Sequence, residues 1–302
     1  MTANAEVTES TIELAAGDLR VVLAPGQGGR IARFDRRVGA ELRPILAPME
    51  AGPGGPRLGS FPMVPYSNRI AHGRLATARG WIEIPPNDPR FAHPIHGDGL
   101  RGTWAVVARS AVAAKIAFAR AADRFWPFAY DAFQEFRLDA DGLELIMELR
   151  NRAAAPMPAG LGWHPYFPRT PLSRIEARFA GVWLEDAEVL PTERVALPAA
   201  WSMSPARPVS DLAVDNCFDG WDGSARLEWP ELGHALDLRA APPIAHAVVF
   251  VPPEKDYFCF EPTTHANGAF AFAARGIAGT GAVDLAPGES LIAKVRWTVT
   301  PL

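Results

Sequence analysis

Two stretches of this chain, LELIMEL at residues 143–149 and AKVRWTV at residues 293–299, decide the class of fold. In both, apolar residues recur at every second position, which puts successive side chains on opposite faces of a β-strand. Shorter stretches with the same alternation occur at residues 20–23, 104–107, 136–138 and 226–229. The pattern predicts many half-buried strands and therefore an all-β protein.

Turn residues separate these stretches. The chain contains 26 Gly and 29 Pro among 302 residues, spread between the apolar runs rather than gathered in one linker. Dipeptides such as Asp-Gly at 141–142 and Pro-Gly at 287–288 favour tight connections between strands. Residues 110–120 are Ala-rich and resemble a helix, but Ala is frequent throughout, so we predict a strand there as well. We expect mostly antiparallel strands in one domain spanning residues 1–302.

Composition excludes several classes of function. The formal charge of −4 is spread without a Lys/Arg block, so we predict no nucleic-acid partner. No apolar run reaches the ~18 residues of a membrane span, and the N-terminus does not read as a secretory signal. Cys217 and Cys259 are the only cysteines and lack metal or redox spacing, which predicts packing residues and a cytoplasmic location. No Gly-rich phosphate loop or Gly-x-Ser-x-Gly elbow occurs, so neither a nucleotide cofactor nor a serine nucleophile is indicated.

Ionisable and aromatic residues are concentrated in four segments rich in Pro and Gly, at residues 61–73, 91–104, 160–168 and 255–268. Their candidates for chemistry are Asn68, Arg69, His93, His96, His164 and Glu261. An amide and a forked guanidinium beside aromatic rings suit recognition of hydroxyl groups. Gly97, directly after His96, would let a ligand approach the backbone closely.

The carboxylate and the imidazoles together can move protons in both directions. Strand alternation puts Glu261 on one face with residues 257 and 259, and we expect Pro262 to end that strand. Partial burial would raise the pKa of Glu261 and make it a better base. Histidine can act as acid or base near neutral pH. From the residues alone, two other interpretations stay open: structural histidines, and a metal site built from His93, His96, His164 and Glu261.

In these segments the sequence resembles the aldose 1-epimerase (galactose mutarotase) family, in the right order over almost the whole chain. The matching motifs are NRI at 68–70 with Gly73, HG at 96–97 followed by Trp104, WPF at 126–128, Asn151, WHPYF at 163–167, VDNCF at 214–218 and FEPT at 260–263. The resemblance implies a β-supersandwich of the galactose mutarotase-like type that binds a small-molecule aldose without cofactor or metal.

The resemblance also implies roles for single residues. Glu261 is expected to take the proton of the anomeric hydroxyl, while His164 protonates the ring oxygen. His96 is expected to assist at the ring oxygen. For substrate binding, the positions that match the family's motifs are Arg69, Asp215, Asn68 and Trp126.

The sequence leaves three points open. Arg74, Arg90 and Arg101 lie near the motifs and could clamp a phosphate, which would make the enzyme a sugar-phosphate 1-epimerase. A non-catalytic carbohydrate-binding protein of the same fold is the other alternative. The chain is expected to be a monomer or a homodimer.

Overall fold

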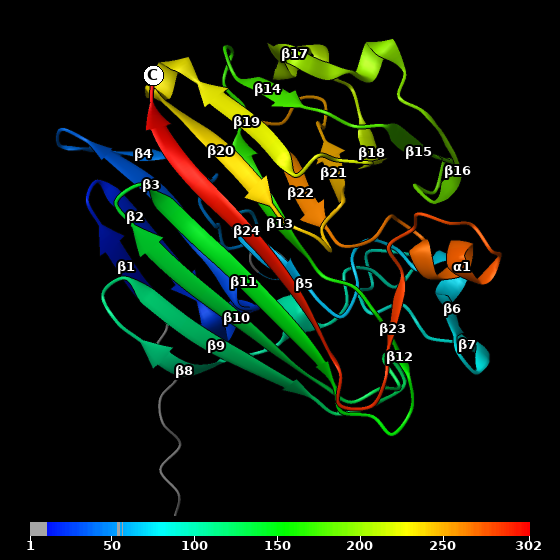
Figure 1. Cartoon of the computed structure of the whole chain (residues 1–302). Helices are drawn as coiled ribbons and strands as arrows, with labels where there is room; N and C mark the ends of the chain where they lie inside the picture. Colours follow the sequence, from blue (N-terminus) through cyan, green and yellow to red (C-terminus); the bar gives the residue numbers. More distant parts are fainter. Residues whose placement is uncertain (1–10, 53–54, 56) are drawn as a thin grey trace, which may run out of the picture.

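Two large β-sheets dominate the computed structural model, which describes residues 11–52, 55 and 57–302 (Figure 1). The first sheet has 11 strands in the order β1-β2-β3-β5-β13-β22-β21-β18-β15-β16, with β4 beside β3. Its strands are β1 (Ile12–Ala16), β2 (Leu19–Ala24), β3 (Arg30–Val38), β4 (Glu41–Pro44), β5 (Ser60–Met63), β13 (Gly162–Pro168), β15 (Gly181–Glu185), β16 (Pro191–Ala196), β18 (Asp215–Asp219), β21 (His246–Phe250) and β22 (Tyr257–Thr263).

The second sheet has nine strands in the order β17-β14-β19-β20-β24-β11-β10-β9-β8. They are β8 (Ala105–Arg109), β9 (Ala113–Arg120), β10 (Tyr130–Asp139), β11 (Gly142–Asn151), β14 (Arg174–Ala177), β17 (Met203–Pro208), β19 (Ser224–Trp229), β20 (His234–Ala240) and β24 (Ser290–Pro301). The alternating stretches at residues 143–149 and 293–299 are neighbours here, because β11 pairs with β24 in register from Gly142–Thr298 to Arg150–Ser290.

Short elements complete the described chain. Two small sheets pair β6 (Arg74–Thr77) with β7 (Gly80–Glu83) and β12 (Met157–Ala159) with β23 (Val283–Leu285). The helices are α1 (Ala269–Ala274) and six 3-10 turns, η1 (Pro25–Gln27), η2 (Ala71–Gly73), η3 (Gly99–Arg101), η4 (Ala199–Trp201), η5 (Val209–Asp211) and η6 (Pro230–Leu232). Figure 1 shows α1 close to β6 and β7, at one end of the molecule.

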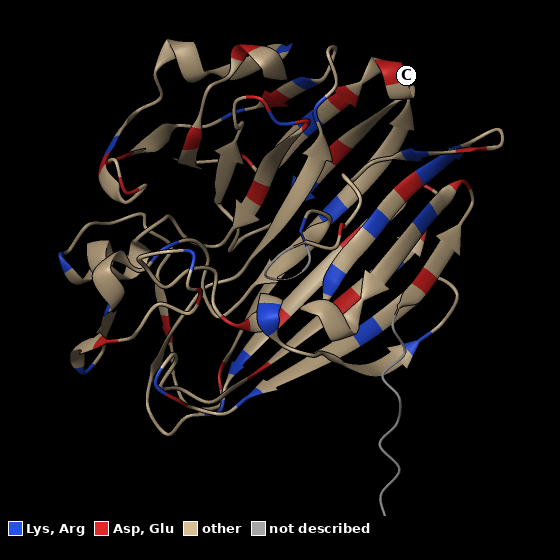
Figure 2. Ribbon diagram, turned by 180° about the vertical axis from the view of Figure 1, so that it is seen from behind, with Lys and Arg blue, Asp and Glu red and all other residues tan. Residues whose placement is uncertain are grey.

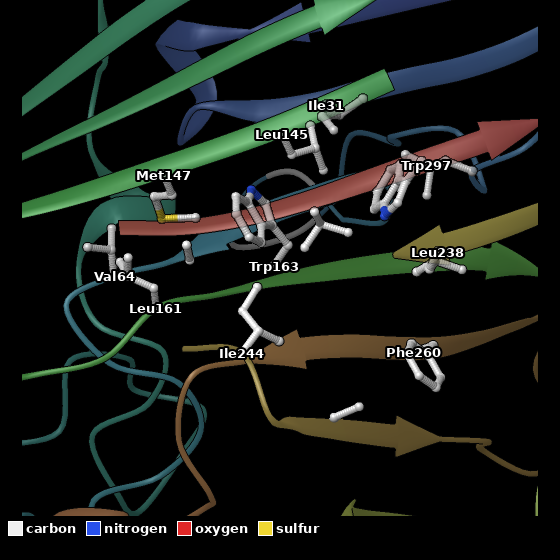
Figure 3. Packing of buried hydrophobic residues seen from close by; sticks show 14 of the residues in the cluster. Ile31, Val64, Leu145, Met147, Leu161, Trp163, Leu238, Ile244, Phe260 and Trp297 are labelled. Atoms are coloured by element: carbon white, nitrogen blue, oxygen red, sulfur yellow. The ribbon is translucent and has the colours of Figure 1, made fainter. Parts of the chain in front are cut away.

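The hydrophobic core lies between the two sheets. Leu145 and Met147 of β11 face Trp163 of β13 across this core, and all three side chains are almost fully buried (Figure 3). Apolar alternation in both sheets points toward this layer, which is why the period of two in the sequence predicted the architecture. Every named strand pair among the described residues is antiparallel, so the all-β prediction is confirmed.

The structure confirms one expectation about a single strand and contradicts another. Residues 113–120 of the Ala-rich stretch form β9, as predicted. By contrast, the expectation that Pro262 ends its strand was wrong, because β22 continues to Thr263. The prediction of one domain over residues 1–302 stays a prediction, and its first ten residues lie outside the described part.

Charged residues are dispersed over the molecule. Figure 2 shows Lys and Arg interspersed with Asp and Glu along the strands, rather than separated onto two faces. In the part of the chain that the structure describes, no helix combines the length and the apolar character needed to cross a membrane.

The core position of Leu145 allows a test of the layer architecture. Leu145 is fully buried, so we expect Leu145→Ala to lower the free energy of unfolding by about 2–5 kcal/mol through lost contacts and a residual cavity. Urea denaturation measures this. Ile292→Ala on the adjacent strand β24 is the control: its side chain is 52% exposed, and we expect a change within about 0.5 kcal/mol. Equal losses in the two variants would contradict the described packing.

Candidate active site

The site is built on the pairing of β13 with β22. Their ladder pairs Gly162 with Thr263 and resumes at Tyr166 with Cys259. The same register across the three intervening residues puts His164 opposite Glu261. Directly opposite residues of an antiparallel pair have Cβ atoms only about 4.5–5.5 Å apart, so the two side chains must meet.

Alternation along both strands turns this pair away from the core. Trp163 and Phe260, each one residue before the pair, are buried in the layer between the sheets. His164 and Glu261 therefore project from the other face of the sheet. Pro165 and Pro262 have no N–H group to donate at this point, yet both strands continue past them.

His164 and Glu261 form a buried acid–base pair. His164 Nε2 lies 3.2 Å from Glu261 Oε1, and the side chains are only 9% and 3% exposed. Burial raises the pKa of Glu261, and the nearby Asp215 raises it further, while Arg69 lowers it. Burial lowers the pKa of His164 to about 3. Glu261 Oε2 is buried and has no hydrogen-bond partner within the described residues.

Aromatic rings hold the His164 imidazole in place. Phe61 of β5 stacks on it with ring centroids 4.5 Å apart, and Tyr166 stacks on it at 4.6 Å. His96 meets it edge-on at 5.4 Å. These contacts restrict the rotamer of His164, so its Nε2 stays directed at Glu261.

A hydrogen bond from the backbone to His96 defines which nitrogen of its ring carries the hydrogen. Its Nδ1 accepts a hydrogen bond from the backbone N–H of Asn68, at 3.1 Å. Burial lowers the pKa of His96, and the neighbouring His164 lowers it further. A neutral ring whose Nδ1 accepts must carry its hydrogen on Nε2. His96 is thus a hydrogen-bond donor.

Gly97 has a different role from the one expected. Its φ of +64° lies in the left-handed region, and a Cβ would come within 2.2 Å of the backbone oxygen of Val64. The residue is required by the approach of the protein's own backbone, rather than by that of a ligand. This close contact between Gly97 and Val64 fixes the position of the loop that carries His96.

A polar cluster lies beside Glu261. Asp215, at the start of β18, and Glu185, at the end of β15, both have raised pKa values because they are buried, and that of Glu185 is about 8. Asn267 donates a hydrogen bond of 2.9 Å to Glu185. Arg69 lowers the pKa of Asp215 electrostatically, so these carboxyl groups face a cation.

One cavity of about 510 Å³ contains the His164–Glu261 pair together with His96, Arg69 and Asp215. It is lined by Arg30, Phe61, Asn68, Arg69, Asp88, Arg90, Phe91, His96, Arg101, His164, Tyr166, Asp215, Tyr257 and Glu261, among others. This volume lies within the range of about 300–1,000 Å³ typical of small-molecule sites. The structure thus brings together six of the seven residues to which the family resemblance assigns a role.

The seventh, Trp126, does not line this cavity. It is 1% exposed and packs against Tyr66 in the core, with ring centroids 5.3 Å apart. An aromatic residue next to Pro is a weak signal for sugar binding, because the same ring serves core packing equally well. The sequence-based assignment of Trp126 to substrate binding is corrected accordingly.

Of the three arginines considered from the sequence as a phosphate clamp, two line the cavity and one does not. Arg74 lies outside the cavity and packs on Trp81, 5.2 Å from its ring centroid. Arg90 and Arg101 do line the cavity, but both bind Asp88, at 2.6 and 3.2 Å. Arg30 and Glu185 stand in no recognisable motif, so no signal in the sequence marks them.

The four-residue metal site considered from the sequence does not form, because His93 binds Glu188 at 3.0 Å in a separate group with His72. Cys259 lies beside the His164–Glu261 pair, and the three residues have ligand atoms within 4.8 Å of one another. Burial raises the pKa of the Cys259 thiol, which opposes formation of the thiolate that binds metals.

An all-β fold with a buried His–Glu pair in a polar cavity suggests a sugar-binding enzyme, and comparisons with known proteins agree with this class. A family model described as aldose 1-epimerase matches residues 10–298. The uncharacterized protein YphB of Escherichia coli strain K12 is 32% identical over 294 residues, which cover 95% of this chain and 97% of YphB. The chain therefore belongs to the aldose 1-epimerase family.

Solved structures support the same fold. A protein from Escherichia coli K12 proposed to be an aldose 1-epimerase matches with a TM-score of 0.85 and 31% identity, over 97% of this chain and 99% of that one. The aldose epimerase homologue from C. elegans matches with a TM-score of 0.80 and 15% identity, over 97% and 99% of the two chains. The galactose mutarotase-like fold predicted from the sequence is confirmed.

The raised pKa of Glu261 makes stability depend on pH. The folded protein retains a proton on Glu261 that the unfolded chain releases above the ordinary pKa of 4.5, so stability is lost as the pH rises from there through the raised pKa. Glu261→Gln removes this loss. We expect the variant to melt about 2 °C or more above the wild type at pH 8, with no such gain at pH 4, as measured by calorimetry.

The matched control is Glu193→Gln, which changes an exposed carboxylate on β16. It should show no pH-dependent gain. If Glu261→Gln gains the same stability at both pH values, the raised pKa is not the cause.

Proposed function

We propose that this protein is a mutarotase that interconverts the α and β anomers of a free hexose by opening and reclosing the sugar ring. The single observation that carries the proposal is the contact of 3.2 Å between His164 and Glu261 inside a cavity of sugar size. Membership of the aldose 1-epimerase family supports it.

Ring opening needs one base and one acid on neighbouring oxygens. Glu261 takes the proton of the anomeric hydroxyl, and the electrons of that O–H bond form the C1=O1 double bond. The C1–O5 bond breaks, and its electron pair stays on O5, which takes a proton from His164. After rotation about C1–C2, reclosure on the other face of the aldehyde reverses both transfers and gives the other anomer.

The pair can hold the proton that each half-reaction needs. Ring opening requires Glu261 ionised and His164 protonated, whereas ring closure requires Glu261 protonated and His164 neutral. Both states contain the same number of protons, and they differ only in which group holds one of them. The pKa directions favour the state with neutral His164 and protonated Glu261, while Arg69 favours the ionised carboxylate. A proton that either group of the pair can hold suits a reaction that runs in both directions.

The remaining residues position the sugar. His96 Nε2 donates a hydrogen bond toward the ring oxygen, because Nδ1 is already occupied by the Asn68 backbone. Arg69 and Asp215 bind hydroxyl groups on the far side of Glu261 from His164. Asn68 supports the site through its side-chain oxygen, which accepts the backbone N–H of Arg69 at 2.8 Å.

Replacing the base tests this mechanism. We expect Glu261→Gln to lower kcat for anomer exchange by about 10²–10⁴-fold, because general base catalysis is lost, while the affinity for the sugar changes little. Exchange is measured by polarimetry and by NMR saturation transfer over a panel of aldoses, and affinity by calorimetry.

Glu193→Gln again serves as the control and should retain wild-type exchange. A wild-type protein that binds aldoses but accelerates the exchange of none would contradict the enzymatic proposal. It would favour the non-catalytic carbohydrate-binding alternative.

A metal-free mechanism gives a second expectation. Proton transfer between Glu261, His164 and the sugar uses no Lewis acid, so treatment with EDTA followed by desalting should leave the exchange rate unchanged. Loss of activity that returns on addition of Zn²⁺ would instead indicate that His164, Cys259 and Glu261 hold a metal ion.

A further inference from the structure

Arg30 is a buried cation in the wall of the sugar cavity, and the mechanism above does not use it. The residue is 4% exposed and begins strand β3. Its guanidinium lies over the ring of Phe61, with Cζ 4.7 Å from the centroid, and Nη1 donates one long hydrogen bond of 3.4 Å to the Leu58 carbonyl. Over the described ranges Nε has no partner, and the guanidinium forms no ion pair.

Such a group needs an explanation, because buried charges are normally paired. Burial lowers the pKa of Arg30 only to about 10, so it remains a cation at neutral pH. A cavity-lining guanidinium with free donors can bind a carboxylate or phosphate through two parallel hydrogen bonds.

The charges around Arg30 add to this preference. Arg90 and Arg101 line the same cavity and share a single carboxylate, Asp88. Three guanidinium groups therefore face one acid at this end. Four further charged residues line the cavity, and they add two charges of each sign: Glu50, Arg57, Lys255 and Asp256.

Strand order shows which part of the substrate reaches Arg30. The order is β3-β5-β13-β22, with neighbouring strands about 4.8 Å apart. Arg30 on β3 thus lies two strands from His164 and on the side away from Glu261. In a pyranose, the ring oxygen lies between C1 and C5, and C5 carries C6. With O1 at Glu261 and O5 at His164, the C6 substituent points across β5 toward Arg30.

We infer that the site also accepts, and prefers to the unmodified hexose, an aldose with an anionic group at C6, either a carboxylate or a phosphate, and that Arg30 binds this group. The inference rests on the proposed function, because it uses the orientation of the sugar over Glu261 and His164. Arg30 is then the residue that discriminates between acidic and neutral aldoses.

The test compares kcat/KM for anomer exchange of glucose and galactose with that of their C6 acids and their 6-phosphates, by NMR saturation transfer. We expect wild type to prefer at least one acidic form. Arg30→Met should lower kcat/KM for that form by about 10- to 100-fold relative to the neutral sugar, because a charged hydrogen-bonding partner is lost. Arg30→Lys retains the positive charge but lacks the two parallel N–H donors of a guanidinium. Its kcat/KM for the acidic form should lie between those of the wild type and Arg30→Met.

Exchange of the neutral sugar in the same variant shows that the protein is folded. Arg74→Met makes the same chemical change outside the cavity and should leave the ratio of acidic to neutral rates unaltered. The acid that shows the larger dependence on Arg30 identifies the group as carboxylate or phosphate.

Separate outcomes overturn the two proposals. A wild type that exchanges neutral and acidic aldoses equally well, or a ratio unchanged in Arg30→Met, overturns the role of Arg30 and leaves the mutarotase proposal intact. Calorimetry could find Arg30-dependent binding of an acidic aldose while the protein accelerates anomer exchange of no aldose. That result would overturn the enzymatic proposal and support the anion site at Arg30.

Discussion

The pairing of β13 with β22 is the constraint on which the rest of the site depends. Its register puts His164 opposite Glu261, and alternation sends Trp163 and Phe260 into the core. The orientation of the acid–base pair is thereby tied to the burial of two large aromatic residues. A shift by one residue would exchange the two faces, bury the ionisable groups in the apolar layer and expose the rings. Hydrophobic packing and active-site geometry are therefore specified by the same strand pairing.

That arrangement has an energetic cost which the large core offsets. Carboxyl and imidazole groups with shifted pKa values are destabilising in their charged forms, and Glu261, Asp215 and Glu185 add mutual repulsion. The described chain buries Trp and Phe side chains along both sheets, including Trp163, Trp229 and Trp297. A two-layer core of this extent can support a polar cavity on the outer face of one sheet. Several ionisable groups with shifted pKa values close to one another are typical of functional sites.

Several features could be predicted from the sequence because they depend on local rules. Alternation with a period of two predicted β11 and β24, and Gly and Pro marked the turns between strands. Motif order pointed to Glu261, His164 and His96 before their positions were known. Expectations that relied on a residue type alone were less successful: Trp126 lies in the core, and Pro262 lies within its strand. A ring or a proline serves several structural purposes, so its neighbours in space decide which one applies.

The sequence by itself determined the fold class and predicted Glu261, His164 and His96 as the acid–base residues, since both rest on short-range patterns of polarity and motif. Only the tertiary structure decided how these residues meet. Glu261 and His164 are separated by nearly a hundred positions, and their contact of 3.2 Å follows from strand register. The same holds for Arg30, which no motif marks and which reaches the cavity because β3 lies two strands from β13. Burial and unpaired charge are properties of the assembled sheets, so no local pattern could reveal them.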